Sequence, residues 1–375
     1  MSELSYLGKL LDGVEVEWLP LSGLARIRNG KDHKSLSEGE FPVYGSGGIM
    51  RYVDTYAYNK PSVLIPRKGS LGNLFFVNVP FWTVDTIFYT EIDEAQIRPK
   101  YLYYFLTTVG LGEMNQAGGV PSQTQSVLNK LKIPIPCPDN PEKSLAIQSE
   151  IVRILDKFTE LTAGLTAELS MRKKQYNYYR DQLLSFKEDE VEGKRKTLGE
   201  IMKMRAGQHI SAHNIIERKE ESYIYPCFGG NGIRGYVKEK SHDGEHLLIG
   251  RQGALCGNVQ RMKGQFYATE HAVVVSVMPG INIDWAFHML TAMNLNQYAS
   301  KSAQPGLAVG KLQELKLFVP SIERQIYIAA ILDKFDTLTN SITEGLPREI
   351  ELRQKQYEYY RDLLFSFPKP ETVSN

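Results

Sequence analysis

The chain has 375 residues, of which 42% are hydrophobic and 23% charged, the composition of a globular protein large enough for two or three domains. Its 44 basic and 43 acidic side chains leave a net charge of +1, which neither requires nor excludes a nucleic-acid partner. Three cysteines without C-x-x-C spacing, an acidic N-terminus and no run of ~18 apolar residues exclude a disulfide framework, a signal peptide and a membrane span. We expect a cytoplasmic protein.

The first globular domain is predicted over residues 1–142. Short β-branched or aromatic runs at 63–66, 74–79 and 86–92 are separated by Gly, Pro and Asn, and a helical pattern follows at 99–110. This arrangement predicts a compact α+β domain with a curved, mostly antiparallel sheet.

A long helix is predicted next, over residues 143–187. Apolar residues recur there at spacings of three and four, from Ile147 to Leu169. The charged stretch at 187–196 then reads as a solvated linker.

The second half of the chain repeats this plan. A second globular domain is predicted over 188–320 and a second long helix over 321–367, followed by a tail at 368–375. Gly345 and Pro347 should break or kink that helix.

Two phrases occur twice in the same order. "ILDKF" stands at 154–158 and at 331–335, and "KQYNYYRDQLLSF" at 174–186 is matched by "KQYEYYRDLLFSF" at 355–367. Blocks further upstream match as well, so the chain is a tandem duplication. We predict an α+β fold in which two similar α/β domains are separated by two long helices that form an antiparallel coiled coil, with pseudo-twofold symmetry. DNA is a partner of matching symmetry, with half-sites about ~34 Å apart.

With these doubled phrases, two halves that end in "PIP" and "FVP", and "DGVEVEWLPL" at 12–21, the chain resembles the specificity subunits of type I restriction–modification enzymes. The run "LTAGLTAEL" at 161–169 is similar to the T-A-E-L spacer repeat of one branch.

The resemblance implies that each globular half is a target-recognition domain, and that together they read a bipartite, asymmetric double-stranded DNA site with a fixed gap. It implies two docked methyltransferase subunits, joined by motor-nuclease subunits, and no membrane. The chain itself would be non-catalytic and hold no cofactor or metal, because S-adenosylmethionine, ATP and Mg would belong to the partner subunits.

Catalytic motifs are missing from the sequence. The N-P-P-F/Y methyltransferase pocket and the P-loop G-K-[ST] are absent, and the glycine motif at 230–235 precedes a predicted strand instead of a helix. Two histidine pairs with i, i+4 spacing lack a third ligand for zinc. These pairs are His209/His213 and His242/His246. A self-sufficient enzyme is therefore not expected, whereas a coiled-coil scaffold that binds only proteins stays open.

Comparison of the two copies indicates where bases are read. Positions kept in both copies should serve the fold or the phosphates, and positions that differ are candidates for base reading, since the two half-sites need not match. Arg67 and Arg251 are kept, while the adjacent residue changes from Lys68 to Gln252. Lys suits guanine O6 and N7, and Gln suits adenine N6 and N7. Alternatively, the two arginines pair with the corresponding acids Asp85 and Glu270.

The remaining candidates lie in glycine-rich or polar loops, which could equally be plain turns. The full set of candidate DNA-contacting residues is Ser46, Arg67, Lys68, Ser70, Ser122, Gln123, Thr124, Asn231, Arg251, Gln252, His271, Ser302 and Gln304.

The tyrosines of the repeated phrase lie on helices, so stacking on bases is not expected. They should either hold the helix ends against the globular domains or form a docking face for the methyltransferase. The candidate docking residues are Tyr176, Tyr179, Arg180, Tyr357, Tyr360 and Arg361.

Overall fold

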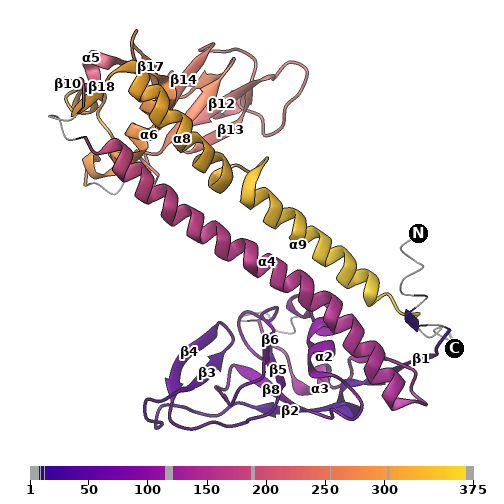
Figure 1. The fold of residues 1–375 in the computed structure, drawn as a ribbon. Helices are drawn as coiled ribbons and strands as arrows, with labels where there is room; N and C mark the ends of the chain where they lie inside the picture. The colour runs from indigo at the N-terminus through magenta and orange to yellow at the C-terminus, as the bar shows by residue number, and fades with distance from the viewer. Residues whose placement is uncertain are drawn as a thin grey trace. The chain divides into compact units, whose positions relative to one another are not determined.

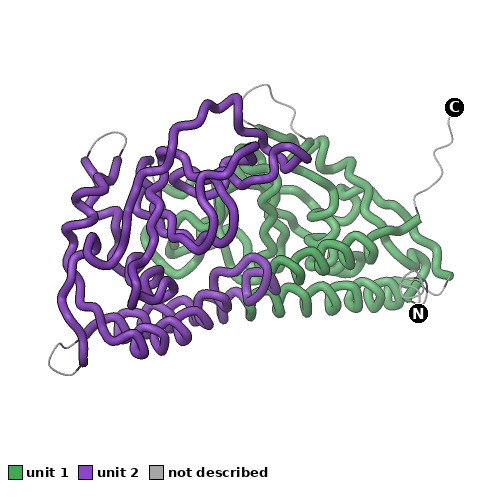
Figure 2. Tube along the Cα trace, turned by 90° about the horizontal axis from the view of Figure 1, so that it is seen from above, with its two compact units in different colours: residues 1–165, 350–375 green, residues 166–349 purple. Residues whose placement is uncertain are grey.

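The computed structural model describes residues 8, 10–11, 13–114, 121–186, 191–253, 255–301 and 305–368. Its helices and strands are drawn in Figure 1. The chain divides into two compact units (Figure 2): unit 1 comprises residues 1–165 and 350–375, and unit 2 comprises residues 166–349. The predicted domains follow the order of the chain, whereas unit 1 combines residues from both of its ends.

Unit 1 contains three small sheets. A four-stranded antiparallel sheet has the order β2-β8-β5-β6, a three-stranded sheet has the order β4-β3-β7 with β3 and β7 parallel, and β1 pairs with β9. The strands are β1 (Val16–Pro20), β2 (Ala25–Asn29), β3 (Phe41–Gly45), β4 (Gly48–Val53), β5 (Ser62–Pro66), β6 (Phe75–Val77), β7 (Trp82–Thr83), β8 (Ile87–Ile92) and β9 (Lys132–Pro136).

Unit 2 repeats this topology strand for strand. Its sheets have the orders β11-β17-β14-β15, β13-β12-β16 and β10-β18, and β12 and β16 are again parallel. The strands are β10 (Gly193–Thr197), β11 (Met202–Ala206), β12 (Tyr225–Gly229), β13 (Gly232–Val237), β14 (Glu245–Gly250), β15 (Val259–Lys263), β16 (Tyr267–Ala268), β17 (Ala272–Val277) and β18 (Lys316–Pro320). The expected mixed α+β fold of two similar domains is confirmed.

The linker predicted at 187–196 is partly wrong. Residues 187–190 lie outside the described residues, but Gly193–Thr197 form β10 and pair in antiparallel register with β18. The side chains of Lys194, Arg195 and Lys196 remain exposed, so only the backbone bonds to β18 reveal the strand.

Long helices pack together in pairs within each unit. The first predicted long helix is α4 (Pro141–Leu184). The second predicted long helix is divided into two, α8 (Ile322–Asn340) and α9 (Gly345–Leu364). Gly345 adopts φ +79°, and a Cβ there would lie 2.4 Å from the carbonyl oxygen of Thr337, so glycine suits this break. No helix within the described ranges is long and apolar enough to cross a membrane.

Shorter helices complete the units. The α-helices are α2 (Pro99–Leu106), α3 (Gln125–Leu128), α5 (Leu198–Ile201), α6 (Ile283–Ala292) and α7 (Val309–Gln313), and the 3-10 helices are η1 (Leu21–Gly23), η2 (Leu111–Glu113), η3 (Ala212–Asn214) and η4 (Leu295–Tyr298).

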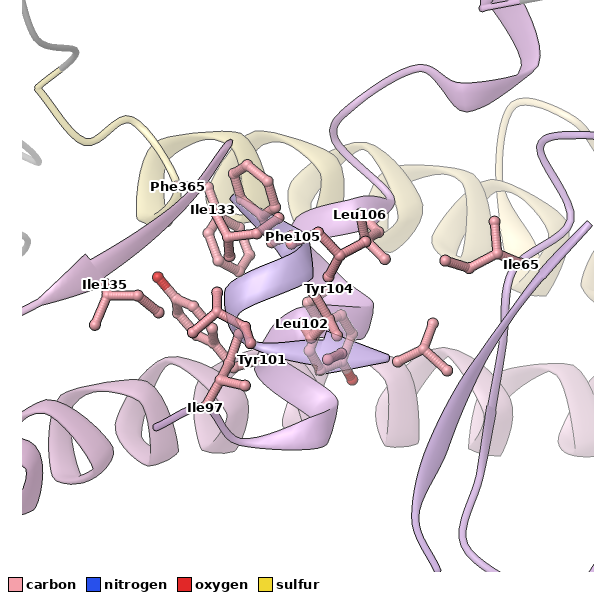
Figure 3. Packing of buried hydrophobic residues seen from close by; sticks show 14 of the residues in the cluster. Ile65, Ile97, Tyr101, Leu102, Tyr104, Phe105, Leu106, Ile133, Ile135 and Phe365 are labelled. Carbon is pink, nitrogen blue, oxygen red and sulfur yellow. The ribbon is translucent and has the colours of Figure 1, made fainter. Parts of the chain in front are cut away.

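The core of unit 1 forms around α2 (Figure 3). Tyr101 is fully buried, and its hydroxyl donates to the carbonyl oxygen of Pro134 at 2.7 Å. Phe365, which follows α9, packs on Tyr101 and Phe105 with ring centroids 5.2 and 5.6 Å away. The end of the chain therefore completes the core of the unit that contains its beginning.

The two repeated phrases meet each other on the helices. In unit 1, Tyr360 of α9 stacks on Phe158 of α4, with centroids 5.4 Å apart at 21°. In unit 2, Tyr179 of α4 stacks on Phe335 of α8, at 5.6 Å and 27°. Each phenylalanine ends an "ILDKF" phrase, and each tyrosine belongs to the Tyr-rich phrase of the other half of the chain. One contact made twice therefore explains why both phrases occur twice.

A buried histidine joins α6 to α8 in unit 2. His288 is fully buried. Its Nε2 lies 2.7 Å from Asp333 Oδ1 and 3.1 Å from Arg261 Nη2, and its Nδ1 lies 3.2 Å from the Tyr176 hydroxyl. Burial lowers the pKa of His288, although Asp333 opposes this shift. The imidazole is therefore neutral, and Arg261 supplies the positive charge opposite Asp333.

In unit 1, the corresponding junction between α2 and α4 contains no histidine among its described contacts. The hydroxyl of Tyr104 donates to Asp156 Oδ1 at 2.7 Å, and Lys100 Nζ binds the same carboxylate at 2.8 Å. The junction in unit 2 therefore carries a histidine whose pKa is lowered by burial, whereas the junction in unit 1 has none among the residues described.

We predict that the stacked pair in unit 2 is energetically coupled. A double-mutant cycle of Tyr179→Leu and Phe335→Leu, measured by urea unfolding, should give a coupling free energy of about 0.5–1.5 kcal/mol, the range for aromatic pairs. In the control cycle, Tyr327→Leu takes the place of Tyr179→Leu and is combined with Phe335→Leu. Tyr327 is 53% exposed, and its ring lies under the guanidinium of Arg324. Equal coupling in the two cycles would contradict the stacking role.

We also predict that acid weakens unit 2 through His288. Its folded pKa lies below the ordinary 6.5, so the unfolded chain takes up this proton first as pH falls. The free energy of unfolding should therefore decrease below about pH 6.5 and level off below the folded pKa. His288→Gln places a side-chain amide where the imidazole was, and this amide does not titrate. The variant should therefore flatten the dependence of the unfolding free energy on pH, measured by urea unfolding between pH 8 and pH 5. The same slope in both proteins would rule this out.

Candidate nucleic-acid interface

Three loops lie together in unit 1, and two of them are joined by backbone bonds. They are the β3–β4 turn at 45–48, the segment after β5 at 66–70, and residues 121–124 before α3; we call them the unit 1 loop cluster. The backbone N–H of Gln123 donates to Arg67 O at 3.0 Å, and that of Gly69 donates to Pro121 O at 2.9 Å. The side chain of Asn73, which follows the second loop, donates from Nδ2 to Ser46 O of the turn at 3.4 Å.

Unit 2 builds the same frame. Its loop cluster comprises the β12–β13 turn at 229–232, residues 250–253 after β14, and residues 305–308 before α7. The backbone N–H of Leu307 donates to Arg251 O at 2.9 Å, and that of Gly253 donates to Pro305 O at 3.1 Å. The second and third loops are thus joined in each unit by matching backbone bonds.

Glycine is required at position 230, where the β12–β13 turn approaches the backbone of residues 252 and 271. A Cβ on Gly230 would lie 2.9 Å from the carbonyl oxygen of His271 and 3.0 Å from that of Gln252. The close approach places Asn231 beside Gln252 and His271, and the three side chains line one hollow of about 390 Å³. Three predicted candidates from separate loops therefore share a surface.

The alternative of arginine–carboxylate pairs does not hold for the described residues. No ion pair joins Arg67 to Asp85 or Arg251 to Glu270 within that part of the chain. The guanidinium of Arg67 lies 5.8 Å from the ring centre of Phe88, and Arg251 donates to the backbone carbonyl of Glu270 at 3.4 Å.

The carboxylate of Glu270 is instead used by a histidine. It accepts from His209 Nδ1 at 2.8 Å, and His271 Nε2 lies 3.7 Å away. Burial raises the pKa of Glu270, but the hydrogen bonds from His209 and the backbone, together with the charges of His209 and His271, outweigh burial and lower the pKa. This leaves the guanidinium of Arg251 without a carboxylate partner among the described residues.

The candidates differ in accessibility. The exposed candidates are Lys68, Ser70, Thr124, Asn231 and Gln252, and the half-buried ones are Ser46, Arg67, Ser122, Arg251 and His271. Ser302 and Gln304 lie outside the described residues.

Gln123 does not fit the predicted role in DNA contact. Its side chain is only 2% exposed, and its Nε2 donates to Pro66 O at 2.6 Å. The corresponding residue in unit 2 is the buried Leu307, so this is a core position. The amide of Gln123 holds the loop in place and is not available to a base.

The first tyrosine of the repeated phrase packs inward. The third, Tyr179 or Tyr360, stacks on a phenylalanine, although Tyr179 remains 44% exposed. Tyr176 is 7% exposed, which favours the alternative that it holds the helix end against the globular domain. Arg180 and Arg361 lie 5.8 Å over the rings of Tyr176 and Tyr357, and each pairs with the aspartate that follows it.

The second tyrosine of each phrase points outward and was missing from the docking set. Tyr178 is 61% exposed and Tyr359 is 49% exposed. Their position between two packed tyrosines on a helix is the sequence signal that could have identified them.

Comparison of the copies also missed two exposed residues beside the turns. Met50 on β4 and Arg234 on β13 occupy the same place in the two hairpins, and Arg234 lines the hollow that holds Gln252. The signal was the change from "GIMRY" to "GIRGY" directly after the turn.

Comparison with known proteins gives consistent matches. The model of the type I restriction modification DNA specificity domain matches residues 14–171 and 190–352. The EcoprrI specificity subunit of Escherichia coli is 68% identical over 92% of this chain and 93% of its own length. The EcoR124I/EcoR124II specificity subunit, also from Escherichia coli, is 45% identical over the full length of both. The S subunit of a type I system from M. genitalium has the same fold, with a TM-score of 0.68 over 96% of this chain and 98% of that one at 16% identity.

We predict that the two kept arginines contribute sequence-independent affinity. Arg67→Ala and Arg251→Ala should each weaken binding to duplex DNA for all sequences alike. Each should also lower the slope of log affinity against log salt by about 0.9, the value for one lost phosphate contact. Arg324→Ala on α8, outside both loop clusters, is the matched control. An unchanged salt slope in both variants would exclude phosphate contact.

Proposed function

The chain belongs to the DNA specificity subunits of type I restriction–modification enzymes, which determine target recognition within the complex and are non-catalytic, and we propose that each of its two units reads one half of a two-part, asymmetric DNA site with a fixed gap. The observation that carries this proposal is the loop cluster, which is built twice on one backbone frame with different side chains.

The clusters combine a constant part with a variable part. Arg67 and Arg251 are kept, and both leave their guanidinium groups free of carboxylate partners among the described residues. The next residue is Lys68 in one cluster and Gln252 in the other, and both are exposed. Constant cations suit phosphates and variable polar groups suit base edges, so the two units would address two different half-sites.

Partner subunits would supply the chemistry. We propose that two methyltransferase subunits dock on the helices, one at each copy of the Tyr-rich phrase, through the outward Tyr178 and Tyr359. This phrase stays constant while the loop clusters differ, as expected if the two partners are identical and the two half-sites are not. Motor-nuclease subunits would join this complex, and S-adenosylmethionine, ATP and Mg would be bound by the partners.

The helix α4 is proposed to set the gap. The run "LTAGLTAEL" at 161–169 lies within α4, which continues through Gly164 without a break. We assign the chain on this basis to the branch with T-A-E-L-like spacer repeats. Insertion of one further four-residue unit would lengthen α4 by about 6 Å at ~1.5 Å per residue and should widen the gap.

Base-modification mapping tests the proposed function. DNA is sequenced for methyladenine from cells that carry this chain with its methyltransferase subunit, and from cells in which this chain is deleted. We expect methyladenine in a two-part motif with a fixed gap, and its loss on deletion. If the marks persist after deletion, another protein chooses the target.

A further inference from the structure

We propose that the bulged residue of one hairpin in each unit, Met50 in unit 1 and Arg234 in unit 2, reads a base, and that Arg234 with Gln252 reads a guanine. This inference rests on the proposed function, because it specifies how one unit would distinguish its half-site. Neither residue is among the DNA-contacting candidates predicted from the sequence.

The same β-bulge occurs in both hairpins. In unit 1, Tyr44 pairs with Ile49 and Val43 pairs with Arg51, so Met50 is the extra residue. In unit 2, Phe228 pairs with Ile233 and Cys227 pairs with Gly235, so Arg234 is the extra residue. Bulges re-aim side chains and are frequent beside functional sites. An identical bulge kept in both units, with different residues on it, fits a frame for variable contacts.

A glycine on the neighbouring strand fixes the direction of the bulged side chain. Met50 Sδ lies 2.7 Å from the position that a Cβ on Gly45 would take, and Arg234 Cδ lies 2.7 Å from the corresponding position on Gly229. Any larger residue at either glycine would displace the side chain that crosses it. Both units therefore hold the bulged residue against the base of the turn.

These side chains are accessible and have no evident internal role. Met50 is 59% exposed and Arg234 is exposed. No ion pair to Arg234 exists within the described ranges, so its charge is available to a ligand. The adjacent isoleucines are also exposed, Ile49 at 49% and Ile233 at 58%, which adds apolar surface at the same place in each unit.

The hollow in unit 2 presents hydrogen-bond donors. Gln252 Oε1 accepts from His271 Nδ1 at 2.7 Å, which leaves the Nε2 amide hydrogens of Gln252 for a ligand. Arg234 lines the same hollow and adds its guanidinium donors. Guanine offers two adjacent acceptors in the major groove, O6 and N7, and so needs only donors. Adenine recognition by Gln also uses the amide oxygen, one of whose two lone pairs already accepts from His271. The surroundings of Gln252 therefore favour guanine over the adenine predicted for it.

Unit 1 offers a different chemistry at the same place. Met50 is apolar and lies beside the exposed Ile49, so this surface suits the C5-methyl group of thymine. The two bulged residues would then contribute to the asymmetry of the two half-sites.

Methyladenine mapping of exchange variants tests this assignment. Arg234→Met should relax one guanine position in one half of the motif, with a loss of discrimination of roughly 5- to 150-fold, the worth of a bidentate arginine–guanine contact. Met50→Arg should alter the other half of the motif only. Arg324→Met on α8 is the matched control and should leave the motif unchanged.

The outcomes separate this inference from the proposed function. A wild-type chain that directs no two-part motif would overturn the proposed function itself. A wild-type motif that Arg234→Met leaves intact would overturn the guanine assignment. Uniform weakening of DNA binding with a salt slope smaller by about 0.9 would also overturn it, because Arg234 would then contact a phosphate. If Arg234→Met fails to fold, Arg234→Ala removes the guanidinium donors without a bulky side chain against Gly229, and it should give the same relaxed position.

Discussion

Each unit depends on an aromatic contact between two helices that come from opposite halves of the chain. Tyr360 stacks on Phe158 in unit 1, and Tyr179 stacks on Phe335 in unit 2. Because each contact takes one phrase from each copy, neither half of the sequence contains a complete unit. Phe365 fills the core around α2 for the same reason, and Trp18 donates to the carbonyl of Pro368 at 2.7 Å. The constraint fixes the helices and leaves the loops free to differ.

That freedom is what a specificity subunit requires. The loop clusters are held by backbone bonds at matching positions, so their side chains can change without a change in the frame. The carbonyl of Arg67 accepts from Gln123, and that of Arg251 accepts from Leu307, although one partner is polar and the other apolar. Substitutions on this frame change the exposed side chains of the loop clusters, while the repeated helical phrases stay constant.

The sequence predicted the repeat, the long helices and the break in the second one. Duplicated phrases, helical periodicity and a Gly and Pro inside a helical pattern are all visible in the sequence itself. It did not predict β10, since a strand with exposed Lys and Arg side chains has no apolar alternation. Gln123 was misread because a polar residue in a polar loop gives no sign that its amide is buried against Pro66. Met50 and Arg234 were overlooked because a bulge depends on the register of two strands, which no single stretch of sequence reveals.

Exchange of one recognition region tests most directly whether each unit reads its own half-site. Residues 41–136 would be replaced by the corresponding segment of a related specificity subunit with a different target, and methyladenine would be mapped in cells with the methyltransferase subunit. The account predicts that one half of the motif changes, while the other half and the gap stay the same. A change in both halves, or in neither, would contradict it.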